Sequence, residues 1–240
     1  MLKKDKKIIF QSLLADSIDK PKPALQFIPE VYKKLDRQMS GQHKKTNQTI
    51  KACVPFLDAY KSGYILPFQI DYDVYYYDGR LNFDASNILS GAQEAEALKN
   101  FKIDFHANEQ VPEELRHDKR TVEAVFKFIN PWTIITPPGY SCLFTQPLNQ
   151  NAPFKIIDGV VDTDKYHNRV HFPFYWTGDI NKRYLLKHGT PMVQVIPFKR
   201  DDWKMEVSKE DAFNEKYWFS LARRLVDGYR QTAWSKKNYK

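Results

Sequence analysis

Alternating apolar and polar residues predict a β-rich body for the middle of the chain. Between residues 64 and 77, one set of alternate positions is apolar: Phe68, Ile70, Tyr72 and Val74. The other set includes Asp71 and Asp73, which we expect on the solvent-facing side because successive strand side chains point to opposite faces. Asp78-Gly79 follows this run, and an Asp-Gly pair between β-type segments is typical of a two-residue hairpin turn.

Short β-type runs also fill residues 122–198, and turns with Pro-Gly, Asp-Gly or His-Gly pairs separate several of them. These runs are Val122–Phe128, Trp132–Thr136, Tyr140–Thr145, Phe154–Ile157, Val170–Trp176 and Met192–Phe198. No helical pattern alternates with them. Closely spaced strands of this kind indicate a compact β barrel or sandwich.

Helical patterns lie mainly towards the two ends of the chain. Pro29 precedes good helix formers and predicts a short helix. A second apolar pattern at helical spacing ends at Gly63, a typical C-terminal cap. Because Pro55 removes one intrahelical hydrogen bond, we expect a break near Ala52. Cys53 lies in the apolar pattern and is expected to be a buried small hydrophobe.

A last helix is expected to start at Ser208 and to include Trp218 and Leu225. We expect it to dock on the protein's own β barrel, and the alternative is that it binds nucleic acid or another protein. The expected segments are an N-terminal extended and helical segment (1–63), a β-rich core domain (64–204) with an insertion (85–120), and a C-terminal basic amphipathic helix (205–240).

The formal net charge of +8 resides at the two ends of the chain. Residues 1–50 carry 11 basic and 5 acidic side chains and residues 199–240 carry 11 and 7, whereas residues 51–198 carry 15 and 17. Basic ends are suited to contact nucleic-acid phosphates or an acidic protein partner. Solvated termini without any partner explain the same distribution.

The two cysteines, Cys53 and Cys142, form no CxxC pair and no metal-type spacing, which argues against a disulfide framework and a zinc site. A reducing compartment fits this usage. The first apolar run, Ile8–Phe10, is too short for a signal sequence or a membrane span. We therefore expect a cytoplasmic protein without a membrane partner. If the protein is viral, this means the host cytoplasm, with the virion as an alternative.

The candidate chemistry lies in the turn Gly159–Tyr166, which places Asp162 and Asp164 two residues apart. A proline-glycine-aromatic turn, Thr136–Tyr140, precedes it, and a strand containing Gln194 follows it. These three motifs, in this order, resemble those of the deoxyuridine triphosphatase (dUTPase) and deoxycytidine triphosphate deaminase superfamily. The resemblance implies that the core of this mainly β (α+β) chain is a β-clip-like barrel or sandwich, the fold which that superfamily shares.

The resemblance also implies roles for individual residues. Asp162 matches the acid that activates the attacking water, and Asp164 is a second candidate catalytic residue. A carboxylate within one water of a phosphorus atom can act as a general base while Mg²⁺ neutralises the phosphates. Tyr166, which matches one residue out of register, would pack on the deoxyribose, and Gln194 would contact phosphate. The candidate ligand-binding residues are Tyr140, Tyr166, Gln146 and Gln194.

Three features that the two activities of this superfamily would require are missing. The turn Phe144–Asn149 contains no arginine to clamp a phosphate. The glycine-rich C-terminal lid of the triphosphatases is absent, and Val170–Trp176 has no counterpart of the deaminases' catalytic glutamate. The sequence therefore favours a non-enzymatic or degenerate ligand-binding or assembly module without a cofactor. The alternative is a Mg²⁺-dependent nucleotide pyrophosphatase that takes a deoxynucleotide, so it stays open whether the chain is an enzyme.

The full-length layout resembles a family of phage proteins that has no assigned activity. The matching stretches are Ile28–Lys33, Asn130–Trp132, Tyr140–Asn149 and Val195–Arg200. This resemblance implies a phage-type protein, and we expect a homo-oligomer that associates through the β body.

His167 and His171 suggest one further alternative, an iron site with Asp162 or Asp164 as in β-barrel oxygenases. The spacing of four residues does not favour it, because residues i and i+4 of a strand lie about 13 Å apart. A structural or surface role is therefore preferred for both histidines, and no metal site is predicted.

Overall fold

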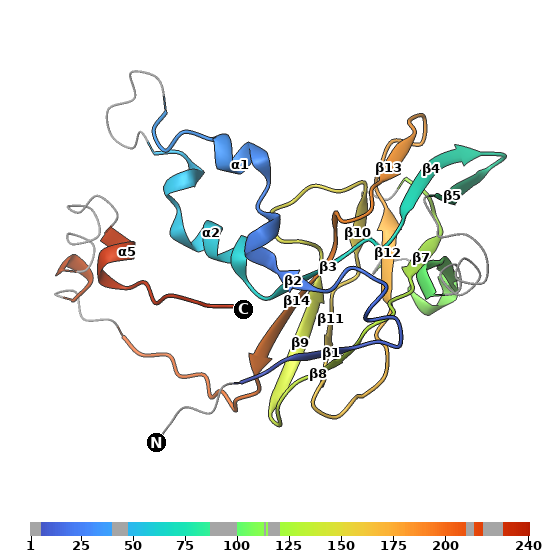
Figure 1. Ribbon diagram of the computed structural model, residues 1–240. Coiled ribbons are helices and arrows are strands. Elements are labelled where there is room, and N and C mark those ends of the chain that lie inside the picture. Colours follow the sequence, from blue (N-terminus) through green and yellow to red (C-terminus); the bar gives the residue numbers. More distant parts are fainter. Residues whose placement is uncertain are drawn as a thin grey trace.

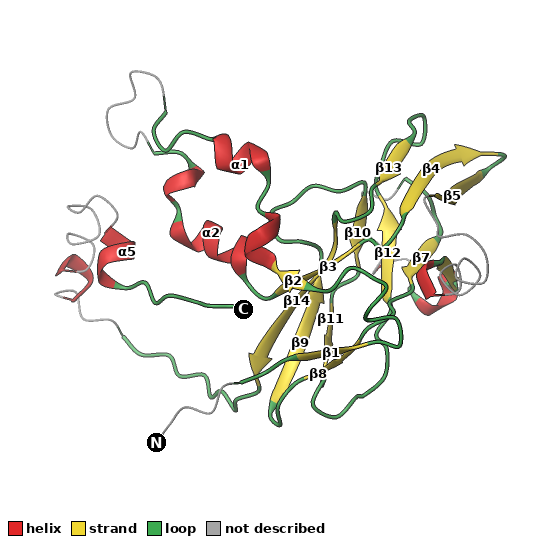
Figure 2. Cartoon of the chain, in the orientation of Figure 1, coloured by secondary structure: helices red, strands yellow, loops and turns green. Residues whose placement is uncertain are grey.

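The computed structural model describes residues 6–39, 48–86, 100–112, 114, 121–209, 214–217 and 228–240. Most regular structure in these residues is antiparallel β, which confirms the mainly β fold class (Figures 1 and 2). The described strands form several sheets that share one hydrophobic core and do not close into a barrel. Every described helix is too short or too polar to cross a bilayer.

The sheet that carries the candidate motifs has five strands in the order β11-β9-β14-β3-β2. Their bounds are β11 Gly159–Val161, β9 Tyr140–Thr145, β14 Pro191–Lys199, β3 Tyr64–Pro67 and β2 Lys22–Pro23. All neighbouring pairs are antiparallel. Because β14 lies between β9 and β3, the downstream motif pairs directly with the strand that follows the Pro-Gly-Tyr turn.

A second sheet supplies most of the aromatic core. Its order is β10-β12-β7-β6, with bounds β10 Phe154–Ile156, β12 Phe172–Trp176, β7 Val125–Phe128 and β6 Ile103–His106. Phe128 and Phe174 stack with ring centroids 3.9 Å apart. Stacked and edge-to-face rings of this kind combine a large buried apolar area with favourable ring geometry. The high aromatic content of the chain is therefore used mainly for packing.

A three-stranded sheet, β13-β4-β5, projects from the body at the end away from α1 and α2 (Figure 1). Its bounds are β13 Tyr184–Leu186, β4 Asp71–Tyr77 and β5 Arg80–Ser86. Asp78 and Gly79 have φ angles of 48° and 74°, which confirms the two-residue hairpin turn. The prediction of a solvent-facing Asp71 was wrong, because its buried carboxylate accepts a 2.6 Å hydrogen bond from the His188 backbone N–H.

Residues 1–63 contribute more than helices to this architecture. β1 (Ile9–Gln11) pairs with β8 (Thr133–Ile135), and β2 extends the five-stranded sheet. The division into segments 1–63, 64–204 and 205–240 stays a prediction, as does the insertion, most of which lies outside the described residues.

The N-terminal helices follow the expected local signals. They are η1 Ala24–Phe27, α1 Glu30–Lys34, η2 Ile50–Ala52 and α2 Val54–Lys61, and a further short helix, η3, spans Asn108–Gln110. The break between η2 and α2 confirms the effect expected of Pro55. Gly63 has a φ of 70°, and a Cβ there would lie 2.0 Å from the Val195 carbonyl oxygen, so this turn requires glycine. Cys53 is exposed, so the prediction of a buried thiol was wrong. The residue lies at the N-cap position, just before α2 begins.

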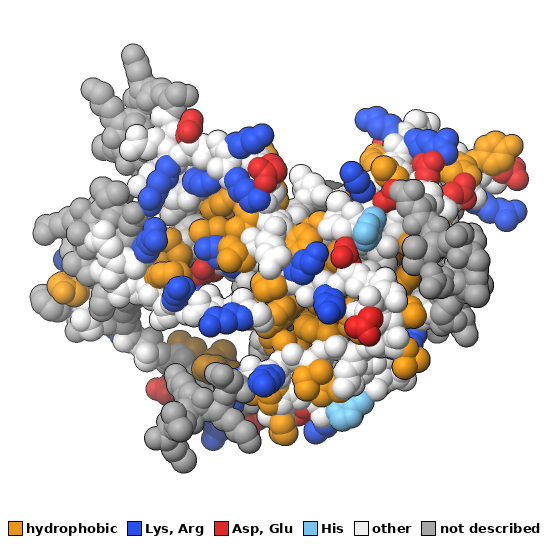
Figure 3. All heavy atoms as spheres, in the orientation of Figure 1, with side chains coloured by type: hydrophobic (Ala, Val, Ile, Leu, Met, Phe, Trp, Pro, Cys, Tyr) orange, Lys and Arg blue, Asp and Glu red, His pale blue; other side chains and the backbone are white. Residues whose placement is uncertain are grey.

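The C-terminal segment returns to the N-terminal helices. Residues 201–209 have no regular secondary structure, residues 214–217 and α5 (Gly228–Thr232) are helical, and Trp218 and Leu225 lie outside the described residues. Asp58 on α2 accepts hydrogen bonds from Trp234 Nε1 at 2.8 Å and from Lys237 Nζ at 2.7 Å. The end of the chain therefore docks on α2. Lys and Arg side chains gather over this helical region on the visible face (Figure 3).

Candidate functional site

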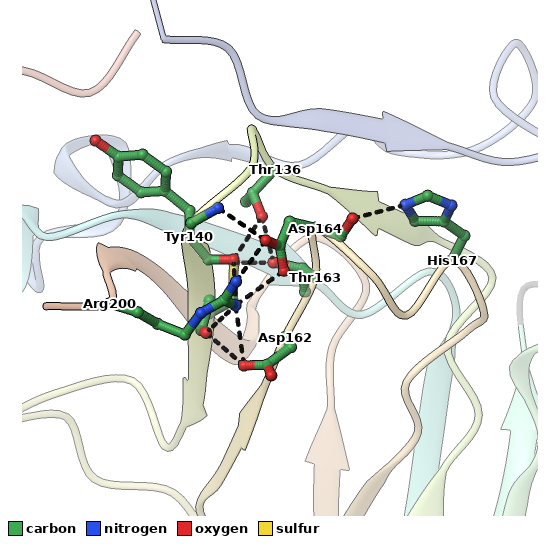
Figure 4. A network of polar contacts seen from close by, with 10 residues as sticks. Thr136, Tyr140, Asp162, Thr163, Asp164, His167 and Arg200 are labelled. Carbon is green, nitrogen blue, oxygen red and sulfur yellow. Dashed lines mark hydrogen bonds and ion pairs between the residues drawn. The ribbon is translucent and has the colours of Figure 1, made fainter. Parts of the chain in front are cut away.

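Sheet register brings three distant segments together at one end of β9. Val161 of β11 lies opposite Cys142 of β9, so Asp162 follows β11 beside the start of β9. On the other side of β9, Lys199 of β14 lies opposite Tyr140, which places Arg200 at the same end. The candidate acids thus lie next to the Pro-Gly-Tyr turn and an arginine (Figure 4).

Arg200 binds both candidate catalytic acids. Its Nη1 and Nη2 donate to the two carboxylate oxygens of Asp164, at 2.8 and 2.5 Å. The same Nη1 lies 3.0 Å from Oδ1 of Asp162. A two-point contact between guanidinium and carboxylate is among the strongest ion-pair geometries. The positive charge of Arg200 is therefore neutralised by carboxylates of the same chain.

Asp164 is held as part of the fold. Its side chain is 5% exposed, and Oδ2 also accepts a 2.8 Å hydrogen bond from the backbone N–H of Gly139. The hydrogen bonds from Arg200, with further help from Gly139, lower the pKa of Asp164 to about 2. Asp164 is therefore ionised at neutral pH and links the two turns.

Asp162 is more accessible. Its side chain is 52% exposed, and Oδ1 accepts a 2.7 Å hydrogen bond from Ser141 Oγ. Ser141 and then Arg200 lower the pKa of Asp162, which keeps it ionised but weakens it as a base. Oδ2 of Asp162 receives no hydrogen bond from the described residues, so one oxygen is available to a ligand or water.

Buried hydroxyl groups lie beside the ion pairs. The hydroxyls of Thr136 and Thr163 lie 2.7 Å apart, and Thr163 Oγ1 donates to Sγ of Cys142 at 3.3 Å. Burial raises the pKa of the Cys142 thiol to about 11, so this cysteine stays protonated. The cluster positions the two turns and offers no reactive nucleophile.

Two of the predicted ligand-binding residues lie at this end of β9. The Tyr140 ring points away from the ion pairs in Figure 4 and contacts Lys6, whose Nζ lies 4.8 Å from the ring centroid. Tyr166 is exposed, and its backbone N–H donates to the Asp162 carbonyl at 2.8 Å. The structure therefore brings Tyr166 beside Asp162, whereas the Tyr140 ring faces another surface.

The other two lie towards the opposite end of β9, about 17 Å from Tyr140 at the usual rise of a strand. Gln194 is 1% exposed, and its amide donates to the carbonyls of Ala59 and Ser62 while its Oε1 accepts from Leu148 N–H at 2.7 Å. Oε1 of Gln146 accepts from the Ile156 N–H at 3.1 Å. Both side-chain amides thus link backbone segments by hydrogen bonds. Neither lies at the end of β9 where Asp162 and Asp164 are found.

The sequence-based interpretation did not include Arg200 among the candidate site residues. Its only local signal is a cation directly after a predicted strand, a position that often has no partner. The partner becomes evident only when β14 is known to pair with β9 in the register that sets Lys199 opposite Tyr140.

The described residues do not fit a metal ion held by the protein. No group of three His, Cys, Asp or Glu side chains among them lies close enough to bind one. An ion at the two acids would also meet the Arg200 guanidinium. His167 contacts the Asp164 carbonyl at 3.2 Å, whereas His171 Nδ1 accepts from Asn130 N–H, and burial lowers the pKa of His171. This arrangement does not support the iron-site alternative.

Comparisons with known proteins add little to these observations. No protein family matches the chain, and no curated protein matches it. A mutant dUTPase from phage phi11 of S. aureus is similar in structure, with a TM-score of 0.37 and 12% identity, over 87% of this chain and 99% of the dUTPase. A mutant dUTPase of Staphylococcus bacteriophage 80alpha, with dUpNHpp, is also similar in structure. Its TM-score is 0.37 and its sequence identity 11%, over 86% of this chain and 90% of the dUTPase. Similarity at this level does not assign the chain to a family.

Proposed function

We propose that this protein is a non-enzymatic β-clip module that serves assembly or ligand binding, in which Asp162 and Asp164 have a structural role. The observation that carries the proposal is the single Arg200 guanidinium that binds both carboxylates. A general base works best when its pKa lies near the working pH, and Arg200 and Ser141 move the pKa of Asp162 in the opposite direction. The proposal includes a phage-type protein in the host cytoplasm or the virion and a homo-oligomeric state.

Charge balance also supports this proposal. A nucleoside triphosphate needs several cationic or N–H donors, and the donors of Arg200 already serve Asp164, Asp162 and Ser141. Binding a triphosphate here would require Arg200 to release Asp164, a nearly buried carboxylate. Leaving such a group without its partner is unfavourable.

A Mg²⁺-dependent nucleotide pyrophosphatase is the second candidate. The favouring observation is that Asp162 is half exposed, with one oxygen unpaired among the described residues and Tyr166 close by. In this proposal Asp162 is the base that receives a proton from the attacking water, and a deoxynucleotide is the ligand. Asp164 then only positions Asp162 through Arg200.

The deciding experiment incubates the full chain with deoxynucleoside triphosphates and Mg²⁺ and measures pyrophosphate release and the melting temperature. The non-enzymatic module predicts no release. Release that Asp162→Asn abolishes, while the exposed control Asp16→Asn retains it, would overturn the non-enzymatic proposal. A ligand that binds only the folded state raises the melting temperature, so a shift without turnover would identify a ligand-binding module.

A further inference from the structure

A nine-residue stretch after β14 combines an extended path with an apolar face that none of the described residues covers. Residues 201–209 have no regular secondary structure, and Figure 1 shows them running clear of the sheets. Trp203, Met205 and Val207 are 89%, 92% and 86% exposed. They alternate with polar residues, which is the pattern of a strand with one apolar face.

The backbone of this stretch is also unpaired within the described part of the chain. The side chain of Asp201 forms an ion pair with Lys199 of β14. Free N–H and C=O groups along an extended segment are a template for pairing with another strand. The stretch therefore has both the backbone and the side chains for strand pairing.

The side-chain sequence is complementary to itself in one antiparallel register. When two copies pair about Met205, Met205 faces Met205 of the partner subunit, and Trp203 faces the partner's Val207. In the same register Lys204 faces the partner's Glu206, and Asp201 faces the partner's Lys209. The Met205 pair lies on the twofold axis and occurs once, each of the other pairs occurs twice by symmetry, and no like charges are opposed.

Neighbouring registers lack this complementarity. A register centred on Lys204 opposes Lys204 to itself and Asp202 to Glu206, and one centred on Glu206 opposes Glu206 to itself. Directly opposite like charges destabilise an antiparallel pair, whereas opposite charges stabilise it. A shift by a single residue would set apolar side chains against polar ones. The sequence thus selects the register centred on Met205.

We propose that residues 201–209 of two chains pair as an antiparallel β-ribbon across a twofold axis at Met205, with a second copy of this chain as the partner. A twofold axis produces this kind of reciprocal contact, in which each residue and its partner exchange roles. The inference rests on the assembly role proposed above and names the surface that mediates it. Because a two-stranded ribbon is only marginally stable, dimerisation depends on protein concentration.

Charge reversal tests the register. Lys204→Glu and Glu206→Lys each create two like-charge pairs and weaken the dimer about tenfold, and the double variant restores it. Mixing the two single variants yields a heterodimer in which every pair at these positions is again opposite in charge. The dissociation constant is measured by sedimentation velocity on the full chain. Circular dichroism checks that the variants fold. We expect them to fold like the wild type, because both positions are exposed.

Disulfide formation tests the position of the axis. In a Cys53→Ser background, Met205→Cys crosslinks two chains under mild oxidation, because directly opposite residues lie within disulfide reach. Lys204→Cys is the matched control: its two copies lie two residues apart along the ribbon, about 7–8 Å or more, and crosslink poorly.

A chain that stays monomeric at all concentrations overturns the inference, as does a dimer that ignores the single reversals or that the double variant fails to restore. Any of these results leaves the structural role of Asp162 and Asp164 unaffected. Nucleotide turnover, in contrast, would overturn the proposed function and leave the ribbon intact.

Discussion

Arg200 Nη1 and Nη2 bind Oδ1 and Oδ2 of Asp164 across 36 residues of sequence, at 2.8 and 2.5 Å. The contact links the end of β14 to the turn after β11. The strand between them, β9, supplies Ser141, and the turn before β9 supplies the Gly139 N–H to Asp164. The site that the motifs indicate is therefore an ion-paired junction of three chain segments.

Arg200→Lys is expected to lower the melting temperature by several degrees, because an ammonium group cannot reproduce the two-point contact with Asp164. Arg183→Lys is the matched control. Arg183 also binds a carboxylate, Asp73, through two nitrogens, but its side chain is 65% exposed against 31% for Arg200. Exposed ion pairs contribute little, so the control should be close to wild type in calorimetry. Equal losses in both variants would contradict the structural role of Arg200.

The stability of the protein should fall in acid partly through Asp164. Its pKa is lowered from 3.8 to about 2 in the folded protein, so its contribution is present above the unfolded-state pKa and is lost as the pH falls towards 2. Urea unfolding at pH 5 and pH 3 should show a smaller decrease for Asp164→Asn than for wild type. Asp16→Asn should keep the wild-type decrease. An unchanged decrease in Asp164→Asn would show that the carboxyl does not contribute.

Gln194→Ala should destabilise the fold by about 2–4 kcal/mol, because it leaves the carbonyls of Ala59 and Ser62 and the Leu148 N–H without their buried partner. Denaturant unfolding measures the loss. Gln146→Ala removes one side-chain hydrogen bond, that to Ile156, and should cost less. A Gln194 variant with wild-type stability that has lost nucleotide binding would instead support the role implied by the motif resemblance.

Asp58→Ala should release the C-terminal segment, because Trp234 and Lys237 both lose their acceptor on α2. Limited trypsin digestion should then cleave at Lys236 and Lys237 faster than in wild type. Asp36 and Asp58 both line a cavity of about 280 Å³ beside Trp234, so Asp36→Ala is the control and should leave the cleavage rate unchanged. Equal cleavage of all three proteins would mean that Asp58 does not hold the segment.

Local conformational preferences explain which predictions were confirmed. Phe68, Ile70 and Val74 are buried as their alternation predicts. The Asp78-Gly79 turn formed because both residues tolerate positive φ, and Pro55 broke the helix because it lacks an N–H. These features depend on neighbouring residues, so a single sequence contains the information for them.

Contacts between distant segments and the positions at which helices begin explain the errors and omissions. Asp71 continues a correct strand pattern but is buried because the loop before Gly189 covers it and donates the His188 N–H. Cys53 belongs to an apolar pattern but lies outside the helix that continues it.

By itself, the sequence determined the β-rich body, its main turns, the N-terminal helices and the proximity of Asp162 to Asp164. Only the tertiary structure decided that Arg200 binds both acids and that Gln194 lies near the other end of β9 with its amide occupied. The physical reason is that a turn depends on the φ and ψ angles of a few adjacent residues. The partner of a charge, in contrast, depends on strand order and register, which are set by packing across the whole core.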